Sequence, residues 1–222
     1  LDADSRGAAR ELVARGREEF LPDDPLAFVD TQLATLDDAP IRAGVNVRST
    51  TVDPIREAAT TCADHGAILE INAHCRQEEL CAVGCGETLL RDTERLTASV
   101  AAAAAAGATV SVKVRAEVDG VDLPATARTL TDAGADAIHV DAMDSEPRIA
   151  DVAAAAPDAF VLANNGVRDR TTTWEYLAHG ADGVSVGRPS DDPAVLERVA
   201  RTVTDWERRG RREAGRDGGV LG

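Results

Sequence analysis

The sequence is almost without lysine and poor in aromatic residues. Lys113 is the only lysine, aromatic residues make up 3% of the chain, and 39 acidic residues against 24 basic ones give a formal net charge of −15. Such an acidic surface is typical of a protein that stays soluble in concentrated salt, where counterions screen its self-repulsion. It also disfavours a broad basic face for binding phosphate backbones.

Long apolar runs and a cysteine framework are also missing. No apolar run approaches the roughly 18 residues that span a membrane, and the opening LDADSRGAAR has no signal-peptide layout, so we expect a cytoplasmic protein with no membrane partner. Four cysteines are too few for a disulfide scaffold. No linker divides the chain, which predicts one domain over residues 1–209 and a disordered tail over 210–222. The sequence leaves the oligomeric state open.

What is present is a regular alternation of short strands and helices. Two helices over 4–20 and 25–36 are expected first. We then expect strands over 42–48, 67–74, 109–115, 137–143, 159–164 and 183–187, and helices over 53–65, 92–106, 122–133, 146–155, 170–179 and 192–209. This alternation predicts an α/β fold with a parallel sheet covered by helices.

Polar residues on one strand face distinguish between two such architectures. The G-x-G-x-x-G turn of a doubly wound sheet is absent. Val110, Val112 and Val114 alternate with Ser111, Lys113 and Arg115, which places a polar set on one face of the strand. An inward polar face favours a (β/α)8 barrel of the TIM type, incomplete because six βα units are visible and a closed barrel has eight. Either the sequence is a fragment, or the helical segment 1–36 fills the gap.

The stretch Ile68–Leu90 carries the strongest sign of chemistry, because a buried strand ends there on Asn72, His74 and Cys75. Cys75 has three interpretations: a small buried hydrophobe, a metal ligand or a catalytic thiol. The metal set would be His74, Cys75, Cys81 and Cys85, but this spacing matches no common zinc or iron–sulfur site, and we expect no metal. We favour the catalytic thiol, with neighbouring cations keeping its pKa near working pH.

Lys113 is the other candidate catalytic residue. A chain that uses arginine at every other basic position and keeps one lysine on an inward strand indicates a need for a compact ammonium group. The alternatives are chance retention and a structural ion pair with Glu70 on the preceding strand.

These residues resemble the flavin-dependent tRNA-dihydrouridine synthases. Asn72-Ala-His-Cys75, Gly84-Cys-Gly86 and Leu89-Leu90 are similar to that family's N-x-G-C-P, G-A-G and paired leucines. The segments VSVKVR (core 111–115), ANNGV (163–167) and GADGVSVGRP (180–189) follow in the family's order. The resemblance covers Arg42 to Pro189.

The resemblance implies FMN as cofactor and NAD(P)H as reductant. Asn72, Lys113 and Arg115 would contact the flavin ring or ribityl chain. The cofactor phosphate would lie at Asn165, Gly166, Gly187 and Arg188. Cys75 would protonate C5 of a uracil while the flavin passes hydride to C6, and a base in tRNA would be turned outward to reach it.

Four positions depart from the family and are expected on the substrate side. His74 replaces a glycine, Arg76 a proline, and Asp141 the histidine of a V-H-G-R-T pattern, while His139 lies on the same strand face as Asp141. The family's opening strand and its helical tRNA-binding domain have no counterpart in this sequence. Three functions therefore stay open: a reductase of uridine in tRNA, a small-molecule FMN oxidoreductase acting on a free pyrimidine or biosynthetic intermediate, and a non-enzymatic barrel.

Overall fold

Parallel strands in chain order form the sheet of this protein. The computed structural model describes residues 1–217, with side chains through residue 210. Within that range the sheet has six strands in the order β1-β2-β3-β4-β5-β6, each parallel to the next. They are β1 (Gly44–Val47), β2 (Ile68–Ala73), β3 (Thr109–Arg115), β4 (Ala137–Asp141), β5 (Phe160–Asn164) and β6 (Gly183–Ser185). The strand predictions are confirmed to within a few residues at each end.

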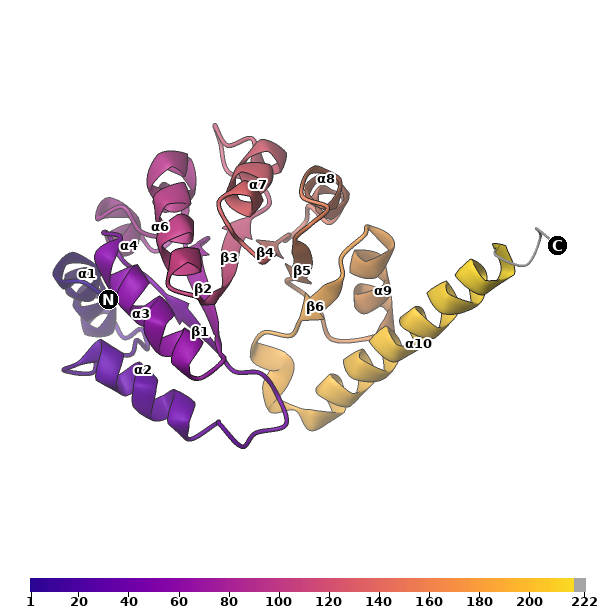
Figure 1. Cartoon of the computed structure of the whole chain (residues 1–222), viewed down its shortest axis with the longest axis horizontal. Helices are drawn as coiled ribbons and strands as arrows, with labels where there is room; N and C mark the ends of the chain where they lie inside the picture. Colours follow the sequence, from indigo (N-terminus) through magenta and orange to yellow (C-terminus); the bar gives the residue numbers. More distant parts are fainter. Residues whose placement is uncertain (218–222) are drawn as a thin grey trace.

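Helices cover the outer face of this curled sheet (Figure 1). The helices are α1 (Ala3–Ala14), α2 (Pro25–Ala34), α3 (Asp53–Asp64), α4 (Glu78–Ala82), α5 (Glu87–Arg91), α6 (Thr93–Ala105), α7 (Leu123–Asp132), α8 (Arg148–Ala155), α9 (Arg170–Ala178), the 3-10 helix η1 (Arg188–Asp191) and α10 (Pro193–Asp217). The arrangement is an incomplete TIM barrel, as the alternation predicted.

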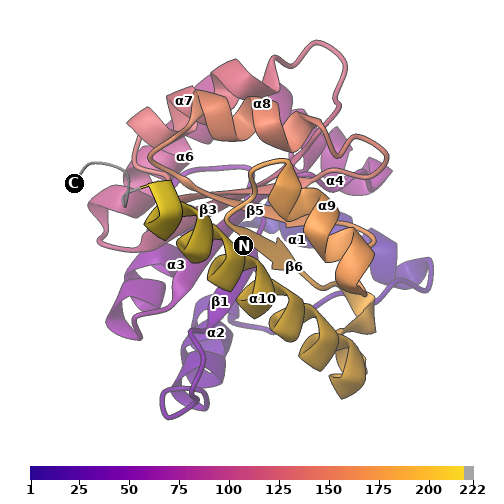
Figure 2. The same cartoon turned by 90° about the vertical axis from the view of Figure 1, so that its right-hand side faces the viewer.

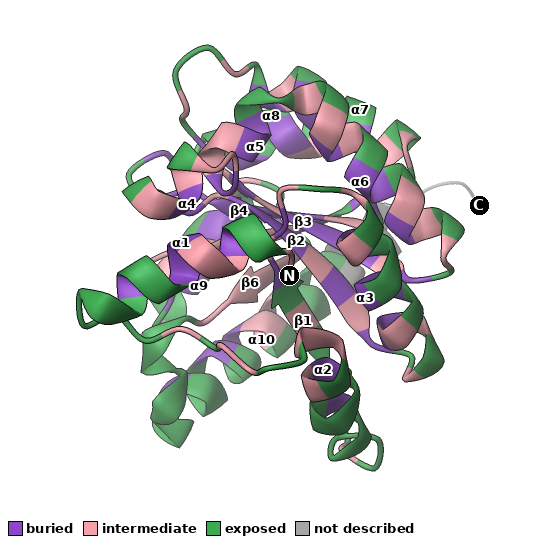
Figure 3. Cartoon of the chain, turned by 90° about the vertical axis from the view of Figure 1, so that its left-hand side faces the viewer, coloured by how far each residue is buried: buried purple, intermediate pink, exposed green. Residues whose placement is uncertain are grey.

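The core lies between the strands and these helices, where Figure 3 shows the buried residues. Val110, Val112 and Val114 of β3 are fully buried on the helix side, whereas Lys113 and Arg115 are only partly buried. The period of two in the sequence therefore separates an apolar outer face from a polar inner face.

Many aspartates in this acidic chain accept backbone hydrogen bonds at the ends of helices and strands. The side chains of Asp2, Asp24, Asp92, Asp122 and Asp169 accept backbone N–H bonds at helix N-termini. This position favours a carboxylate because the first backbone N–H groups of a helix lack partners.

The aspartates of the two Gly-Ala-Asp turns, each just before a strand, also accept backbone N–H bonds. Asp136 accepts a hydrogen bond from the N–H of Val110 at 2.8 Å, and Asp182 accepts one from the N–H of Val161 at 2.8 Å. Each carboxylate thus ties the start of its own strand to the strand before it.

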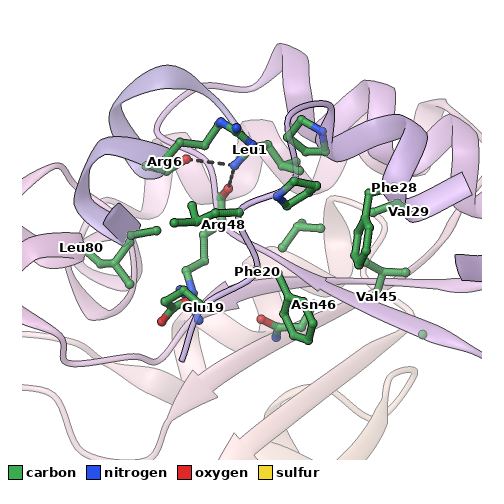
Figure 4. A pocket seen from close by; sticks show the side chains of 17 residues that line it. Leu1, Arg6, Glu19, Phe20, Phe28, Val29, Val45, Asn46, Arg48 and Leu80 are labelled. Atoms are coloured by element: carbon green, nitrogen blue, oxygen red, sulfur yellow. Dashed lines mark hydrogen bonds and ion pairs between the residues drawn. The ribbon is translucent and has the colours of Figure 1, made fainter. Parts of the chain in front are cut away.

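The first helix is shorter than expected. It ends at Ala14 rather than near residue 20 because Gly16 takes a left-handed conformation (φ +80°) that turns the chain away. The segment that follows, with α2, lies beside β1 without pairing with it, and a cavity of about 380 Å³ remains between them. Figure 4 shows Phe28 beside Val45 and Glu19 beside Arg48 in that cavity.

The last helix is longer than expected. α10 continues past Arg209 to Asp217, into the segment for which we expected a disordered tail, and residues 218–222 lie outside the described residues. α10 packs against α9 (Figure 2) and extends away from the sheet (Figure 1). The rings of Trp174 and Trp206 meet edge to face at 5.1 Å, and the guanidinium groups of Arg170 and Arg209 each lie 4.7 Å from the Trp174 ring.

Asp2 fastens α1 to the loop after β1. Its carboxylate accepts hydrogen bonds from Ser49 Oγ at 2.7 Å and from the N–H and Oγ1 of Thr50 at 2.8 Å, besides its cap bonds within α1. Burial alone would raise the pKa of Asp2, but these hydrogen bonds outweigh it and lower the pKa below the ordinary value.

We expect Asp2→Asn to lower stability at pH 7 by about 1–3 kcal/mol, because the variant loses charge-assisted hydrogen bonds. A lowered folded-state pKa gives stability that is present above the ordinary pKa of about 4 and is lost below it. The difference between wild type and variant, measured by urea unfolding, should therefore shrink as the pH falls below about 4. Asp4→Asn, at an exposed position of the same turn, is the control, and an equal loss there would contradict this account.

Gly86 is required where the chain passes close to Cys75. Its φ is +60°, and a Cβ there would lie 2.2 Å from the carbonyl oxygen and 2.6 Å from the Sγ of Cys75. We expect Gly86→Ala to destabilise the protein by roughly 2–4 kcal/mol in urea unfolding, from backbone strain and overpacking. Gly7→Ala, where a Cβ meets nothing within 4 Å, should instead stabilise by roughly 0.5–1 kcal/mol.

Candidate active site

A cavity of about 780 Å³ opens at the carboxyl ends of the central strands. We call it the mouth. Eight of the twelve residues that the sequence singled out line it, namely Asn72, His74, Cys75, Arg76, Arg115, Asp141, Asn165 and Arg188. Lys113 and His139 belong to the strand layer beneath it, and Gly166 and Gly187 do not line it. Strand polarity brings these residues together, because the carboxyl ends of parallel strands share one edge of the sheet.

Glu70 organises the layer beneath the mouth. Its Oε1 accepts a hydrogen bond from Asn46 Nδ2 at 2.7 Å, and its Oε2 accepts from Ser111 Oγ at 3.1 Å and His139 Nδ1 at 2.7 Å. Burial opposes ionisation, but the hydrogen bond and charge of His139, the Asn46 bond and the Lys113 charge together lower the pKa of Glu70 to about 2. Glu70 is therefore an ionised, fully engaged acceptor.

The suggested ion pair between Glu70 and Lys113 is wrong. Lys113 influences Glu70 only through its charge, and its ammonium group makes no hydrogen bond or ion pair with any residue that the structure describes. On the two neighbouring strands Asn72 and His139 stand in register with Lys113. Lys113 is partly buried, and its ammonium group is thus available to a ligand.

Asn72 shapes the turn at the end of β2. Its Nδ2 donates to Asn46 Oδ1 at 2.9 Å, while its Oδ1 accepts from the backbone N–H of His74 at 3.4 Å and of Cys75 at 3.3 Å. The residue is 3% exposed. Asn72 therefore holds the turn that carries both candidate substrate-side and catalytic groups.

His74 is a neutral imidazole in this turn. Burial, followed by the positive charge of Lys113, lowers its pKa to about 4. Its Nδ1 lies 3.2 Å from Asn72 Oδ1, which can only accept, so Nδ1 carries the proton. Nε2 is then a hydrogen-bond acceptor on the residue that replaces the family's glycine.

The Cys75 thiol differs from expectation. It packs in a small apolar cluster with Ala8 and Leu12 of α1, Leu80 and Cys85, and the residue is 6% exposed. Burial raises the pKa of Cys75 to about 11, and the charge of Arg48 offsets this only in part. The expected pKa near working pH is therefore wrong, since the thiol faces apolar side chains rather than a cluster of cations. Cys75 is held in its protonated form.

Arg115, Asp141 and Asn165 form one side of the mouth. Arg115 Nη2 lies 3.4 Å from Asp141 Oδ2, and Asn165 Nδ2 donates to Asp141 Oδ1 at 2.9 Å. Asn165 has a positive φ of 101°, and Tyr176 Oη donates to the carbonyls of Asn164 and Asn165. Gly166 follows with φ +70°. Asp141 and Tyr176 thus stabilise an unusual backbone turn where the cofactor phosphate was expected.

Arginines surround the mouth although the chain is acidic overall. Six arginines line it against three carboxylates: Arg15, Arg17, Arg48, Arg76, Arg115 and Arg188 against Glu78, Glu79 and Asp141. The guanidinium groups of Arg17 and Arg188 form no ion pair with a described residue. Sequence reasoning missed Arg15, Arg17 and Arg48, which gave no signal because the segment from α1 to β1 reaches the mouth only in the folded chain.

The interior face fits a flavin on two observations. The ammonium group of Lys113 has no hydrogen-bond or ion-pair partner among the described residues, and the buried Nε2 of His139 has no hydrogen-bond partner either. Both stand in one layer under an open mouth, where a ring bearing carbonyls and ring nitrogens would satisfy them. Asn72, Lys113 and Arg115 would hold such a ring, and Asn165, Gly166, Gly187 and Arg188 the phosphate.

Among the described residues there is no group of three or more histidine, cysteine, aspartate or glutamate side chains placed to hold a metal ion. No helix within the described part of the chain is long and apolar enough to cross a membrane.

Comparison with solved structures places the fold. The ligand-free type DHODH from Eimeria tenella superposes with a TM-score of 0.65 and 15% identity, over 83% of this chain and 67% of that one. DHODH from the same organism in complex with ferulenol gives the same score and identity and covers 65% of that chain. Identity this low shows a shared fold.

Comparison with sequences places the family. The uncharacterized protein MJ0144 of Methanocaldococcus jannaschii is 26% identical over 197 residues, which are 85% of this chain and 76% of that protein. The family model for dihydrouridine synthase (Dus) matches residues 30–214. The family match supports an FMN-dependent oxidoreductase. Since the family model spans most of the sequence, this chain belongs to the dihydrouridine synthase family.

Proposed function

We propose that this protein reduces the C5–C6 double bond of uridine in tRNA, using FMN and reducing equivalents from NAD(P)H, with Cys75 as the proton donor. The observation that carries the proposal is the composition of the mouth. Asn72 and Cys75 stand together at the end of β2, in a cavity lined by six arginines within a chain of net charge −15.

FMN, when bound, would supply the hydride that adds to C6 of the base. The remaining steps belong to the chain's own residues. Lys113 would bind the pyrimidine end of the flavin through its unpaired ammonium, and Arg115, fixed by Asp141, would lie along it. The turn at Asn165 and Gly166, with Gly187 and Arg188, would hold the phosphate.

Cys75 suits an acid rather than a nucleophile. Its pKa of about 11 keeps the thiol protonated at neutral pH. Proton transfer breaks the S–H bond and forms a C–H bond at C5 of the base, and the resulting thiolate regains a proton from water. His74 supports this step because its Nε2 can accept the N3–H of a uracil ring, which would orient the base beside Cys75.

The arginines favour a polyanionic substrate. Arg17, Arg76 and Arg188 line the mouth, and Arg76 has only a distant partner, Glu87 at 4.0 Å. Guanidinium groups recognise phosphate oxygens well, and a base in RNA could turn outward into the cavity. The overall acidity of the chain disfavours a broad phosphate-binding face, but this local positive charge would bind phosphate groups at the mouth.

A free pyrimidine or biosynthetic intermediate is the second candidate substrate. The mouth, at about 780 Å³, lies within the roughly 300–1,000 Å³ of small-molecule sites. Deletion of the gene followed by measurement of dihydrouridine in host tRNA separates the two. A lower level supports the tRNA substrate, and an unchanged level overturns it in favour of the small molecule.

We expect Cys75→Ala to keep FMN binding and NAD(P)H oxidation while product formation falls by about 10²–10⁴-fold, the usual contribution of a general acid. Single-turnover reduction of substrate by the pre-reduced enzyme measures this step. Cys62→Ala, which removes a fully buried thiol from α3, is the control. Full turnover by Cys75→Ala would remove Cys75 from the acid role.

We expect the variants Arg17→Ala and Arg188→Ala each to weaken tRNA binding and to lower the slope of log K against log salt by about 1, as for a lost phosphate contact. Arg128→Ala, on the exposed side of α7, is the matched control. Filter binding over a salt series gives both quantities. Slopes identical to the wild type would contradict a phosphate contact at the mouth.

A further inference from the structure

His139 is a buried polar residue of the interior face with one ring nitrogen bonded and the other without a partner among the described residues. It is 4% exposed, and its Nδ1 lies 2.7 Å from Glu70 Oε2. Because the ionised Glu70 can only accept, Nδ1 must donate, and the imidazole ring is fixed in orientation. Its other nitrogen, Nε2, is buried and lacks a hydrogen-bond partner among the described residues.

An unpartnered buried nitrogen is costly and needs a physical reason. A lost hydrogen bond on a buried polar atom costs about 1–3 kcal/mol, so folded chains seldom keep one without use. Glu70 does not need a histidine for its own sake, since Asn46 and Ser111 already donate to its two oxygens.

Lys113, a neighbour of His139, also has a polar group without a hydrogen-bond partner among the described residues. Lys113 stands in register with His139 on β3, and its ammonium group makes no hydrogen bond or ion pair with a described residue. Two unsatisfied polar groups on adjacent strands, under the mouth, indicate one ligand that serves both. The pyrimidine end of a flavin carries ring nitrogens and carbonyl oxygens side by side, which matches such a pair.

We infer that His139 is a positioning residue of the cofactor site rather than a substrate residue: Glu70 fixes the ring through Nδ1, and Nε2 is reserved for a hydrogen bond with the pyrimidine ring of FMN next to Lys113. This inference rests on the proposed function, because it requires that the interior binds FMN. In this inference Glu70 orients His139, whereas a Glu70 that only paired with Lys113 would have no such role.

Two substitutions separate this role from a purely structural one. In His139→Asn the side-chain amide takes the place of Nδ1 and keeps the bond to Glu70, but nothing reaches the place of Nε2. In His139→Gln the amide reaches the place of Nε2 and the bond to Glu70 is lost. His179→Asn, at the partly buried C-cap of α9, is the control.

The measurements are FMN affinity of the full-length apoprotein, the reduction potential of the bound flavin and thermal stability. We expect His139→Asn to bind FMN about five- to tenfold more weakly, the effect of one lost hydrogen bond, with a shifted potential and near-wild-type stability. His139→Gln should bind FMN within about twofold of wild type but melt at a lower temperature. The opposite order would show that His139 serves only Glu70 and would overturn the inference.

A measurement on the unmutated protein does not depend on how the variants fold. In ¹⁵N NMR of histidine-labelled protein, the Nε2 resonance of His139 should move when FMN is added, and an unmoved resonance would overturn the inference. Failure of the wild type to bind FMN at all would overturn the proposed function as well. Wild-type binding that His139→Asn leaves unchanged would overturn this inference alone.

Discussion

The arrangement of the interior depends on one buried carboxylate, Glu70. It draws donors from three strands, Asn46 of β1, Ser111 of β3 and His139 of β4. Asn46 in turn accepts from Asn72, which holds the turn of His74 and Cys75. Because a buried charge is tolerated only when its hydrogen bonds are complete, this network fixes the relative positions of four strands. The mouth stands on that layer.

The network also explains why Lys113 is free. A lysine beside a glutamate usually forms an ion pair, yet here neutral or hydrogen-bonding donors occupy both oxygens of Glu70. The ammonium group still feels the negative charge and keeps its place on the inner face. Its hydrogen bonds are left for a ligand, which is the arrangement a cofactor site requires.

An apolar environment and a positively charged one lie side by side at the mouth. Cys75 is packed among apolar side chains of α1 and the Leu80 segment, which keeps it protonated, while the arginines a few residues away keep the surroundings positive. The segment from α1 to β1 contributes to both environments, because Leu12 covers the thiol and Arg15 and Arg17 border the opening. A chain with strong negative charge thus presents positive charge at one place, where its parallel strands end.

The sequence by itself determined the strand order, the polar inner face and the family, because periods of two and of about 3.6 residues and short motifs are local properties. It also identified Asn72, Cys75, Lys113 and Arg115 as one group. Only the tertiary structure decided that Glu70 binds His139 rather than Lys113, that the Cys75 thiol is buried under α1, and that Arg15, Arg17 and Arg48 reach the mouth. Those outcomes depend on which side chains meet across strands and helices distant in sequence, and a local pattern holds no information about such contacts.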